Sequence, residues 1–330
     1  MAIDCYGFKN IKNVIDTILK NQNECNVLLL GYADIILTKK ELQTFLTKSI
    51  IDNLENREDA ISVAAMYHKE ELVEWVCETY SLFESLGCKL SVVDFTSWSG
   101  KEEIVNLNYP IDDKYKNRYD FIIDSGTTEH IFNIPQVMSN ILSMLKVGGY
   151  VSHTTPFNDP NHGFYNFSPT FYVDFYHENR AEVISCNLTQ TDCNTDEIPL
   201  PTREVFKLDS GLNFVVVRKN SNVNAIIYPI QGRYKSSAFE DSENILNKYK
   251  NFTNIVLTPY NGQSKNLEKI FKDKNIVFLD DNIILTKYLN IDPISSIVDK
   301  EFDIVLITSV TFEEKIRKKL EELGISKEKI

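Results

Sequence analysis

The residues best suited to chemistry gather between Asp124 and Pro169. This stretch begins DSGTTEHIFNIPQ and ends LKVGGYVSHTTPFNDPNHGFYNFSP. An imidazole beside a carboxylate can take a proton from a hydroxyl or amine, because histidine titrates near neutral pH. The residues of this kind in the stretch are Glu129, His130, His153, Asp159, His162 and Tyr165. We predict a proton-transfer site here, with His130, Asp159 and Tyr165 binding the substrate.

Two of these histidines are candidates for the general base. His162 lies in NDPNHG, whose turn-forming residues predict an exposed loop, and Gly163 beside it permits close approach of the backbone. Alternatively, His162 braces this loop against the aromatic residues that follow. His153 lies in an apolar strand pattern, which also fits a hydrogen-bonded residue of the core. We predict His162 or His153 as the base.

Other polar residues follow predicted strands, where an open parallel sheet binds its ligands. Asp94 ends the strand LSVVDF and could accept hydrogen bonds from ribose hydroxyls, or could be a solvated strand-end residue. Gly31 follows NVLLLGY, where a backbone without a side chain can approach a ligand. Ser125 and Gly126 form a small-residue turn next to which an adenosyl group could lie. These positions predict a nucleotide-type cofactor.

Strands and helices alternate along the first part of the chain, which is the signature of a doubly wound, mostly parallel α/β sheet. The predicted strands are 26–32, 90–95, 103–108, 119–126 and 150–156, and 182–190 and 213–220 read as a closing antiparallel pair. The predicted helices are 8–21, 38–50, 70–86, 135–148 and 169–179, with Gly87 and Gly148 as stop signals. Asp120 and Asp124 lie four residues apart on one strand, so ~13 Å should separate them.

A second, smaller Rossmann-like α/β pattern follows. Its predicted strands are TNIVLTPY, IVFLDDN and FDIVLITS, with a helix at 267–271 and a last helix that has a Thr311–Glu314 capping spacing and stops at Gly324. Asp280 and Asp281 read as solvated turn residues. We predict one domain at residues 1–235, a linker at 236–251 and a second domain at 252–330.

Composition excludes several classes of protein. The 330 residues carry a net charge of −12 with no basic cluster, which disfavours nucleic acid as a partner. No apolar run reaches the ~20 residues of a membrane-spanning helix. The six cysteines show no CxxC spacing, so neither a metal site nor a disulfide framework is predicted. We expect a cytoplasmic protein with reduced thiols.

The segment YDFIIDSGTTEHIFNIPQVMSNILSMLKVGGYVSHTTPFNDPNHGFYNFSPTFYVDFY resembles, without a gap, a bacterial branch of the class I S-adenosylmethionine-dependent methyltransferases. The resemblance implies a Rossmann-like methyltransferase fold with S-adenosylmethionine as the cofactor. It makes Asp94 the ribose-side acid, and the stretch from Asp124 to Glu129 the cofactor wall. It also implies a carbohydrate-type or nucleotide-sugar acceptor, methylated on a hydroxyl or amine during surface polysaccharide synthesis.

The chain departs from this family after the first strand. LLLGYADIILTKK replaces the usual acid-x-Gly-x-Gly-x-Gly loop, and the span from there to Asp94 is unusually long. A second interpretation is therefore kept: a non-catalytic methyltransferase-like module that binds a nucleotide sugar or scaffolds a glycan assembly enzyme. A nicotinamide oxidoreductase is disfavoured because neither block carries GxGxxG. The C-terminal block faintly resembles the small Rossmann-like domains of sugar-modifying enzymes.

Overall fold

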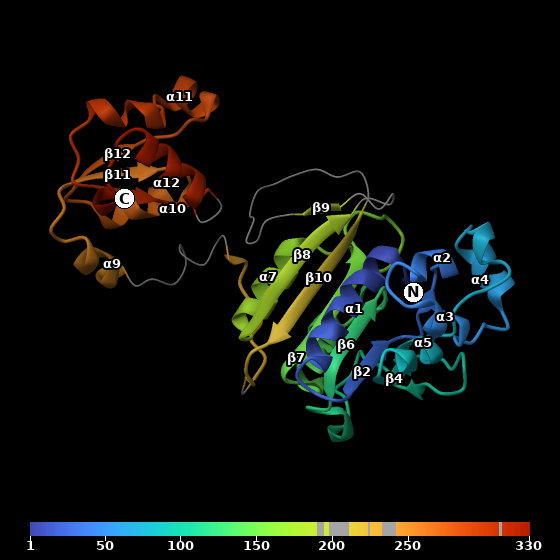
Figure 1. The fold of residues 1–330 in the computed structure, drawn as a ribbon. Helices are drawn as coiled ribbons and strands as arrows, with labels where there is room; N and C mark the ends of the chain where they lie inside the picture. The colour runs from blue at the N-terminus through green and yellow to red at the C-terminus, as the bar shows by residue number, and fades with distance from the viewer. Residues whose placement is uncertain (190–194, 198–210, 224, 233–241, 310–311) are drawn as a thin grey trace. The chain divides into compact units, whose positions relative to one another are not determined.

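Strand β2 (Cys25–Leu30) is an inner strand of an eight-stranded sheet, and nearly all of its side chains are buried. It pairs in parallel with β4 (Cys88–Asp94) on one side and with β6 (Tyr119–Ser125) on the other. The computed structural model describes residues 1–189, 195–197, 211–223, 225–232, 242–309 and 312–330. The strand order is β5-β4-β2-β6-β7-β10-β8-β9 (Figure 1). The expected mostly parallel sheet is confirmed.

The rest of this sheet also follows the predicted pattern. Strand β10 lies antiparallel between β7 and β8, as expected for the closing pair. The remaining strands are β5 (Glu103–Ile104), β7 (Leu145–Pro156), β8 (Ala181–Thr189), β9 (Thr195–Glu197) and β10 (Leu212–Lys219). Two short strands, β1 (Ala2–Ile3) and β3 (Asp34–Ile35), form a separate parallel pair.

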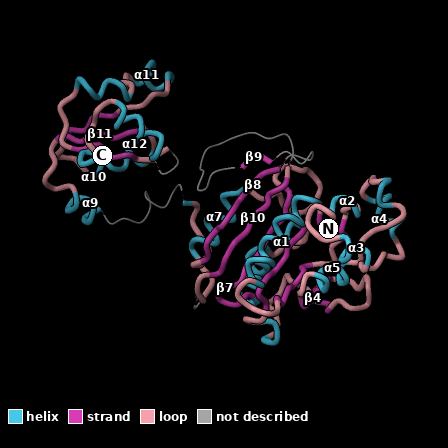
Figure 2. The backbone as a smooth tube through the Cα atoms, viewed as in Figure 1, coloured by secondary structure: helices cyan, strands magenta, loops and turns pink. Residues whose placement is uncertain are grey.

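Helices cover both faces of the sheet (Figure 2). Alternate residues of β2 point to opposite faces, so Val27 and Leu29 enter one core while Leu28 and Leu30 enter another. The first core holds the apolar side of α1 (Cys5–Leu19) and α5 (Thr79–Ser85). The second holds α6 (Ile134–Met144) and α7 (Pro169–Glu178). The sheet is thus wound on both sides.

Three helix predictions in the first unit were wrong in extent. The predicted helix 70–86 is a 3-10 turn η1 (Glu70–Leu72) and then α5, because Cys77 between them makes strand-like bridges with Ile35 and Asn56. The predicted helix 135–148 ends at Met144, and Gly148 instead lies within β7 at φ +85°. The predicted helix 38–50 is divided into α2 (Lys39–Leu42) and α3 (Lys48–Asp52).

The unusually long span between β2 and β4 supports the N-terminal strand. It contains α2, α3, α4 (Ala60–Met66), η1 and α5. Arg57 of this span forms an ion pair with Asp34. The Tyr67 hydroxyl donates to Asp34 Oδ2 at 2.8 Å, and its oxygen also lies 3.0 Å from the Met1 carbonyl oxygen. The insertion therefore holds β1 and β3 against the carboxyl edge of the sheet.

The second unit contains a three-stranded parallel sheet of order β12-β11-β13. Its elements are α9 (Ser242–Lys248), β11 (Asn254–Thr258), α10 (Gly262–Ile270), β12 (Asn275–Phe278), α11 (Ile283–Leu289), η4 (Ile294–Asp299), β13 (Ile304–Ile307), α12 (Glu313–Glu322) and η5 (Lys327–Lys329). Ile245 of α9 is buried with Ile255 and Leu257, so the end of the predicted linker packs into this unit. The predicted cap Thr311 lies outside the described residues.

In both units, an aspartate carboxylate binds the backbone at the amino end of the first strand, β2 or β11. Asn26 opens NVLLLGY and Asn254 opens NIVLTPY. Asp120 Oδ2 accepts the backbone N–H of Asn26 at 3.0 Å, and Asp303 Oδ2 accepts that of Asn254 at 2.8 Å. Asp120 therefore lies at the edge opposite the predicted site, as its spacing from Asp124 indicated.

The two units also resemble each other at the carboxyl ends of their first strands. Asp94 Oδ2 accepts the backbone N–H of Tyr32 at 2.9 Å, and Asp280 Oδ2 accepts that of Tyr260 at 2.8 Å. The prediction of Asp280 as a solvated turn residue was wrong, because it is buried and its other oxygen accepts the Asn282 N–H. Each unit therefore has a hydrogen bond from the loop after its first strand to an acid at or just after its second strand.

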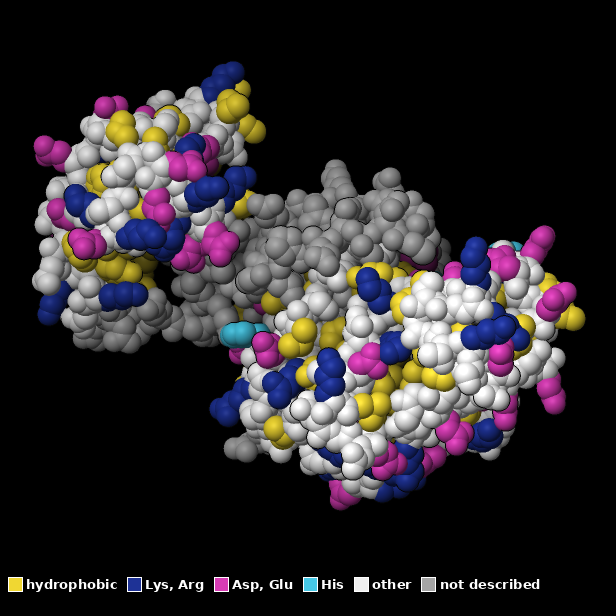
Figure 3. All heavy atoms as spheres, in the orientation of Figure 1, with side chains coloured by type: hydrophobic (Ala, Val, Ile, Leu, Met, Phe, Trp, Pro, Cys, Tyr) yellow, Lys and Arg dark blue, Asp and Glu magenta, His cyan; other side chains and the backbone are white. Residues whose placement is uncertain are grey.

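The surface mixes charges of both signs. On the face in Figure 3, Lys and Arg side chains are interspersed with Asp and Glu over both units. Among the described residues, none of the helices has the length and apolar content needed to cross a bilayer.

Each unit has its own buried core, so the first should fold without the second. We expect a chain of residues 1–228 to unfold in one cooperative thermal transition, close to a transition of the full-length protein. Calorimetry of the full-length and shortened chains tests this. A shortened chain without a cooperative transition would contradict the division.

Candidate functional site

A cavity of about 410 Å³ opens at the carboxyl ends of β2, β4 and β6. The strand order reverses between β2 and β6, which is where open α/β sheets bind ligands. The lining residues come from the predicted cofactor positions and from the segments after β5 and β6: Met1, Gly31, Val93, Asp94, Phe95, Val105, Asn106, Leu107, Asn108, Thr127, His130 and Ile131. Gly31, Asp94 and His130 were predicted site residues, and Thr127 lies within the predicted cofactor wall, whereas Phe95 was missed.

Gly31 lies where the backbone must turn closely past other groups. Its φ is +83°, and a Cβ there would lie 2.1 Å from Met1 Sδ and 2.9 Å from Thr127 Oγ1. Thr127 donates its hydroxyl to the Leu30 carbonyl oxygen, and its Oγ1 lies 2.7 Å from Met1 Sδ. A single glycine thus allows β1 and the loop after β6 to meet beside the cavity.

Asp94 and Phe95 stand together at the end of β4. Asp94 is half-buried and accepts the backbone N–H groups of Tyr32 and Thr96, at 2.9 and 3.1 Å. Phe95 lines the same cavity and is 74% exposed. An exposed aromatic ring beside a carboxylate can stack on a planar base whose ribose reaches the acid. The one sequence signal for Phe95 is its place directly after Asp94.

Asp124 is wholly buried, and donors from the turn after β6 and from β7 surround it. Its carboxylate accepts the backbone N–H groups of Thr127 and Thr128, at 3.1 and 3.0 Å, and the Thr128 hydroxyl. His153 Nδ1 on β7 lies 2.7 Å from Asp124 Oδ2, and His153 Nε2 lies 2.6 Å from the Tyr176 hydroxyl on α7. These contacts satisfy the carboxylate without a ligand.

The neighbours of His153 fix its tautomer. Burial raises the pKa of Tyr176 well above its usual range, so the phenol keeps its proton and donates to Nε2. The Nδ1 proton of His153 then points to Asp124. A proton relay to an acceptor would need an exposed end, and His153 has no exposed surface.

Three predicted site residues are therefore buried and form hydrogen bonds with other groups of the protein. His153 cannot act as the base because an acceptor cannot reach it. The Asp124 carboxylate binds the backbone of the segment after β6. The Ser125 hydroxyl donates to the Ala2 carbonyl oxygen at 2.7 Å, which fixes β1. Sequence spacing placed all three residues at the carboxyl edge of the sheet. It could not show that their polar atoms form hydrogen bonds with other groups of the protein.

The 3-10 turn η3 (Thr128–His130), capped by Asp124, presents Glu129 and His130. Glu129 is 1% exposed, and its Oε2 has no hydrogen-bond partner among the described residues. Burial, helped by the negative charge of Asp124, raises the pKa of Glu129 to about 8. Burial and the nearby His162 lower the pKa of His130, which favours its neutral form.

His162 lies over this turn, on the loop that follows β7. Its Nδ1 is 3.1 Å from Asp159 Oδ2, and its Nε2 is 3.6 Å from Glu129 Oε1. The approach depends on Gly163, where a Cβ would lie 2.8 Å from the Glu129 carbonyl oxygen. The next residue, Phe164, donates its N–H to that same oxygen at 2.8 Å. The structure thus brings together four predicted residues: Glu129, His130, Asp159 and His162.

Aromatic rings surround this cluster. Phe132 and Phe164 are 68% and 65% exposed, and their rings meet edge to face at 5.6 Å between centroids. Tyr165, a predicted substrate residue, donates its hydroxyl to the Phe132 carbonyl oxygen at 2.9 Å. Tyr165 therefore braces the pair, and the exposed faces belong to residues that the sequence analysis did not single out.

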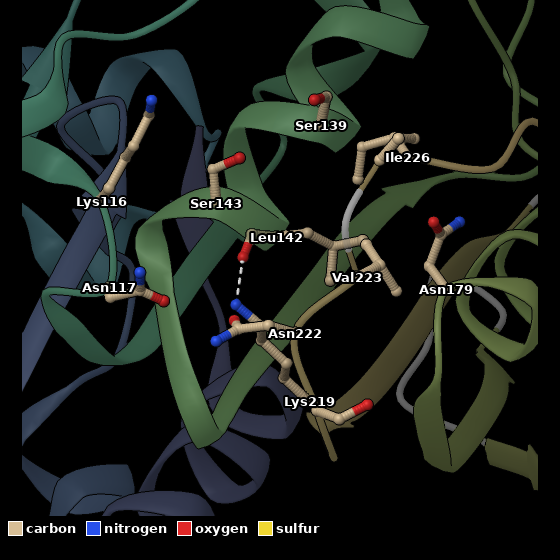
Figure 4. Close-up of a pocket in the computed structure, with 12 residues that line it drawn as sticks. Lys116, Asn117, Ser139, Leu142, Ser143, Asn179, Lys219, Asn222, Val223 and Ile226 are labelled. Carbon is tan, nitrogen blue, oxygen red and sulfur yellow. Dashed lines mark hydrogen bonds between the residues drawn. The ribbon is translucent and has the colours of Figure 1, made fainter.

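Another cavity, of about 360 Å³, lies at the opposite edge of the sheet (Figure 4). Its buried cation, Lys219, donates to the carbonyl oxygens of Leu142 and Leu145, at 2.7 and 2.8 Å. Lys219 therefore binds the carboxyl end of α6. It is not left available for a ligand, so the site at the carboxyl edge remains the better candidate.

Comparison with known proteins finds similarity in solved structures only. No family model and no curated protein matches the chain. The 1,6-didemethyltoxoflavin-N1-methyltransferase of Burkholderia thailandensis, solved with S-adenosylhomocysteine, is 11% identical over 64% of this chain and 78% of its own, with a TM-score of 0.35. The CurJ carbon methyltransferase is 10% identical over 64% and 54%, at 0.38. The [4+2]-cyclase SpnF is 12% identical over 64% and 81%, at 0.30.

We predict that Asp124→Asn destabilises the first unit. The substitution removes the charge to which four donors point, and hydrogen bonds to charged groups contribute about 1.5–3 kcal/mol each. The unfolding free energy should fall by at least about 2 kcal/mol. Tyr176→Phe, which removes one hydroxyl from the same chain of hydrogen bonds, should cost about 1 kcal/mol. Denaturant titration measures both, and equal stabilities of Asp124→Asn and the parent would refute the central role of this carboxylate.

Proposed function

We propose that the first unit binds S-adenosylmethionine at its carboxyl edge and transfers the methyl group to a hydroxyl or amine. The observation that carries the proposal is a juxtaposition: His130 lines the cavity at the strand-order reversal and also belongs to the imidazole–carboxylate cluster beside it. A cofactor and a proton-accepting group must be neighbours for methyl transfer. The resemblance of Tyr119–Tyr176 to class I methyltransferases supports the same reaction.

The adenosyl end of the cofactor fits between β4 and the segment after β5. Asp94 would bind the ribose hydroxyls, and Phe95 would stack on the adenine. Both line the cavity, as does Gly31. Asp94 Oδ2 also binds the Tyr32 N–H, so this acid links the cofactor to the first loop.

The methionine end would lie near Gly31 and Thr127, where the Met1 thioether now makes its contacts. Binding therefore requires the Met1 side chain to move. The unbranched Met side chain has three rotatable bonds, so this movement is cheaper than a backbone change. A chain without glycine at position 31 would lose this space.

The acceptor would lie between the cluster and the exposed aromatic pair Phe132 and Phe164. Its oxygen or nitrogen forms a bond to the methyl carbon while the S–CH3 bond breaks and its electrons return to sulfur. His162 Nε2, oriented by Asp159 through Nδ1, takes the acceptor proton. The products are the methylated acceptor and S-adenosylhomocysteine.

We favour a carbohydrate-type acceptor, such as a nucleotide sugar. Aromatic faces pack well against the apolar C–H faces of sugar rings, and hydroxyls are the atoms that imidazoles and carboxylates bind. Phe132 and Phe164 offer such faces beside His130 and His162.

The second candidate is a non-catalytic module that binds a nucleotide sugar. The observation in its favour is that Met1 occupies the methionine end of the cavity while Asp124 and Ser125 bind only protein groups. Calorimetric titration with S-adenosylhomocysteine and with uridine diphosphate sugars separates the two. Binding of the sugar nucleotide alone would favour the module.

Asp94→Ala should weaken S-adenosylhomocysteine binding at least tenfold, because the charged partner of the ribose contributes about 1.5–3 kcal/mol. Asp120→Ala is the matched control, since Asp120 makes the equivalent clamp at the other end of the sheet. It should lower stability and leave the affinity unchanged. Equal losses of affinity in both variants would show that Asp94 acts only through folding.

His162→Ala should lower methyl transfer about 100-fold or more, as expected for loss of a general base. Because His162 is 42% exposed, the melting temperature and S-adenosylhomocysteine affinity should change little. Initial rates can be measured with radiolabelled cofactor on any acceptor found in a sugar and nucleotide-sugar screen. A large drop in melting temperature would instead assign His162 to bracing the loop.

A further inference from the structure

We infer that Glu129, His130 and His162 form a binding site for a divalent transition-metal ion beside the cavity that His130 lines. Each residue offers one ligand atom, and these atoms lie within 4.8 Å of one another. The Glu129 Oε1 atom is 3.6 Å from His162 Nε2 and 4.0 Å from His130 Nε2. Ligands at about 2.1 Å from one ion lie ~3–4 Å apart, so small side-chain rotations complete the site.

The burial of Glu129 is a second, independent observation in favour of a metal site. It is 1% exposed, and its Oε2 has no hydrogen-bond partner among the described residues. A buried carboxylate without a partner is costly, whereas a bound cation removes the cost. Native proteins leave few buried polar groups in this condition, and a carboxylate that binds an ion is one of the cases in which they do.

The imidazoles are also placed as ligands. The rings of His130 and His162 lie side by side, with centroids 5.4 Å apart and planes 32° apart. His162 directs Nδ1 to Asp159 at 3.1 Å, which leaves Nε2 facing Glu129. Metal-binding histidines commonly have such a carboxylate on the other ring nitrogen, because it fixes the tautomer and orientation.

The backbone holds the two halves of the site together. Asp124 caps the turn that presents Glu129 and His130, and the close contact of Gly163 with the Glu129 carbonyl oxygen places His162 above it. The ligands thus come from loops after adjacent strands, β6 and β7. A site built on fixed backbone costs little to order when the ion binds.

The donor set indicates the class of ion. Imidazoles suit zinc, iron, copper and nickel, whereas magnesium and calcium prefer oxygen ligands. Two histidines and one carboxylate leave coordination positions open, as in catalytic rather than structural sites. An acceptor hydroxyl could occupy an open position and lose its proton to water more easily, because the ion stabilises the alkoxide.

This catalytic role rests on the proposed function, but binding of the ion does not. If the ion binds, His162 acts as a ligand, and the ion promotes loss of the acceptor proton. The acceptor oxygen then forms its bond to the methyl carbon as the S–CH3 bond breaks, as above. Metal binding is measured without cofactor, so it can succeed or fail separately from methyl transfer.

The test uses the untagged full-length protein, treated with chelator and dialysed. Calorimetric titration with Zn²⁺ should give one site per chain, and the melting temperature should rise with Zn²⁺. Mn²⁺ should bind at the same site, as seen by loss of the free-ion electron paramagnetic resonance signal. Mg²⁺ should bind far more weakly. Mn²⁺ also controls for binding to thiols, because it favours oxygen ligands over thiolates.

Glu129→Gln and His162→Ala should each reduce the affinity for both ions by more than about 100-fold, and Asp159→Asn by about 10–100-fold, the range typical of a ligand's outer partner. His177→Ala is the control, because that histidine is 84% exposed on α7 and lies outside the cluster. It should bind both ions like the parent.

The ion-free Glu129→Gln protein gives a further readout. Since Oε2 of Glu129 has no hydrogen-bond partner among the described residues, the substitution should leave the melting temperature without metal equal to or above that of the parent, and the Zn²⁺-dependent rise should vanish. A purely structural role for Glu129 predicts a lower melting temperature instead. The inference is overturned if the parent binds neither Zn²⁺ nor Mn²⁺ at millimolar concentration, or if Glu129→Gln binds them as the parent does.

Discussion

The buried carboxylate of Asp124 connects the sheet, the helix layer and the candidate site. It receives hydrogen bonds from the turn after β6, while His153 links it to Tyr176 on α7. A charge in the interior is stable only when enough donors surround it, so these groups must arrive together. The same requirement fixes the turn that presents Glu129. The position of the Glu129, His130 and His162 cluster therefore depends on the hydrogen bonds that surround the Asp124 charge, rather than on contacts within the cluster.

Close backbone contact is the second constraint on the site. Gly163 passes against the Glu129 carbonyl oxygen, and Gly31 lets Met1 and Thr127 meet at the end of β2. Side chains at either glycine would separate segments that lie far apart in the sequence. Small residues thus bring the imidazoles, the carboxylate and the cavity within one region, while the polar groups that surround them supply the chemistry.

The two units bind the free backbone N–H groups at the ends of their first strands in the same way. In each, an acid at or just after the second strand binds the loop after the first. An acid at the start of a strand that pairs with the first, β6 or β13, binds the start of the first strand. Backbone N–H groups at strand ends have no partner in the sheet, so a carboxylate there stabilises the fold. Asp94 has this role whether or not it also binds a ribose. Its counterpart Asp280 makes the same backbone contact in the second unit.

The sequence by itself determined the alternation of strands and helices, the parallel sheet and the edge at which polar residues gather, because burial on two faces imposes continuous apolar runs. It did not determine which polar atoms the protein itself would satisfy. His153 and His162 look alike as residues, yet tertiary contacts bury one between Asp124 and Tyr176 and leave the other half-exposed. Helix extent near Cys77 was likewise decided by bridges to distant segments. Local pattern sets where a side chain lies along an element, whereas its burial and partners depend on segments distant in sequence.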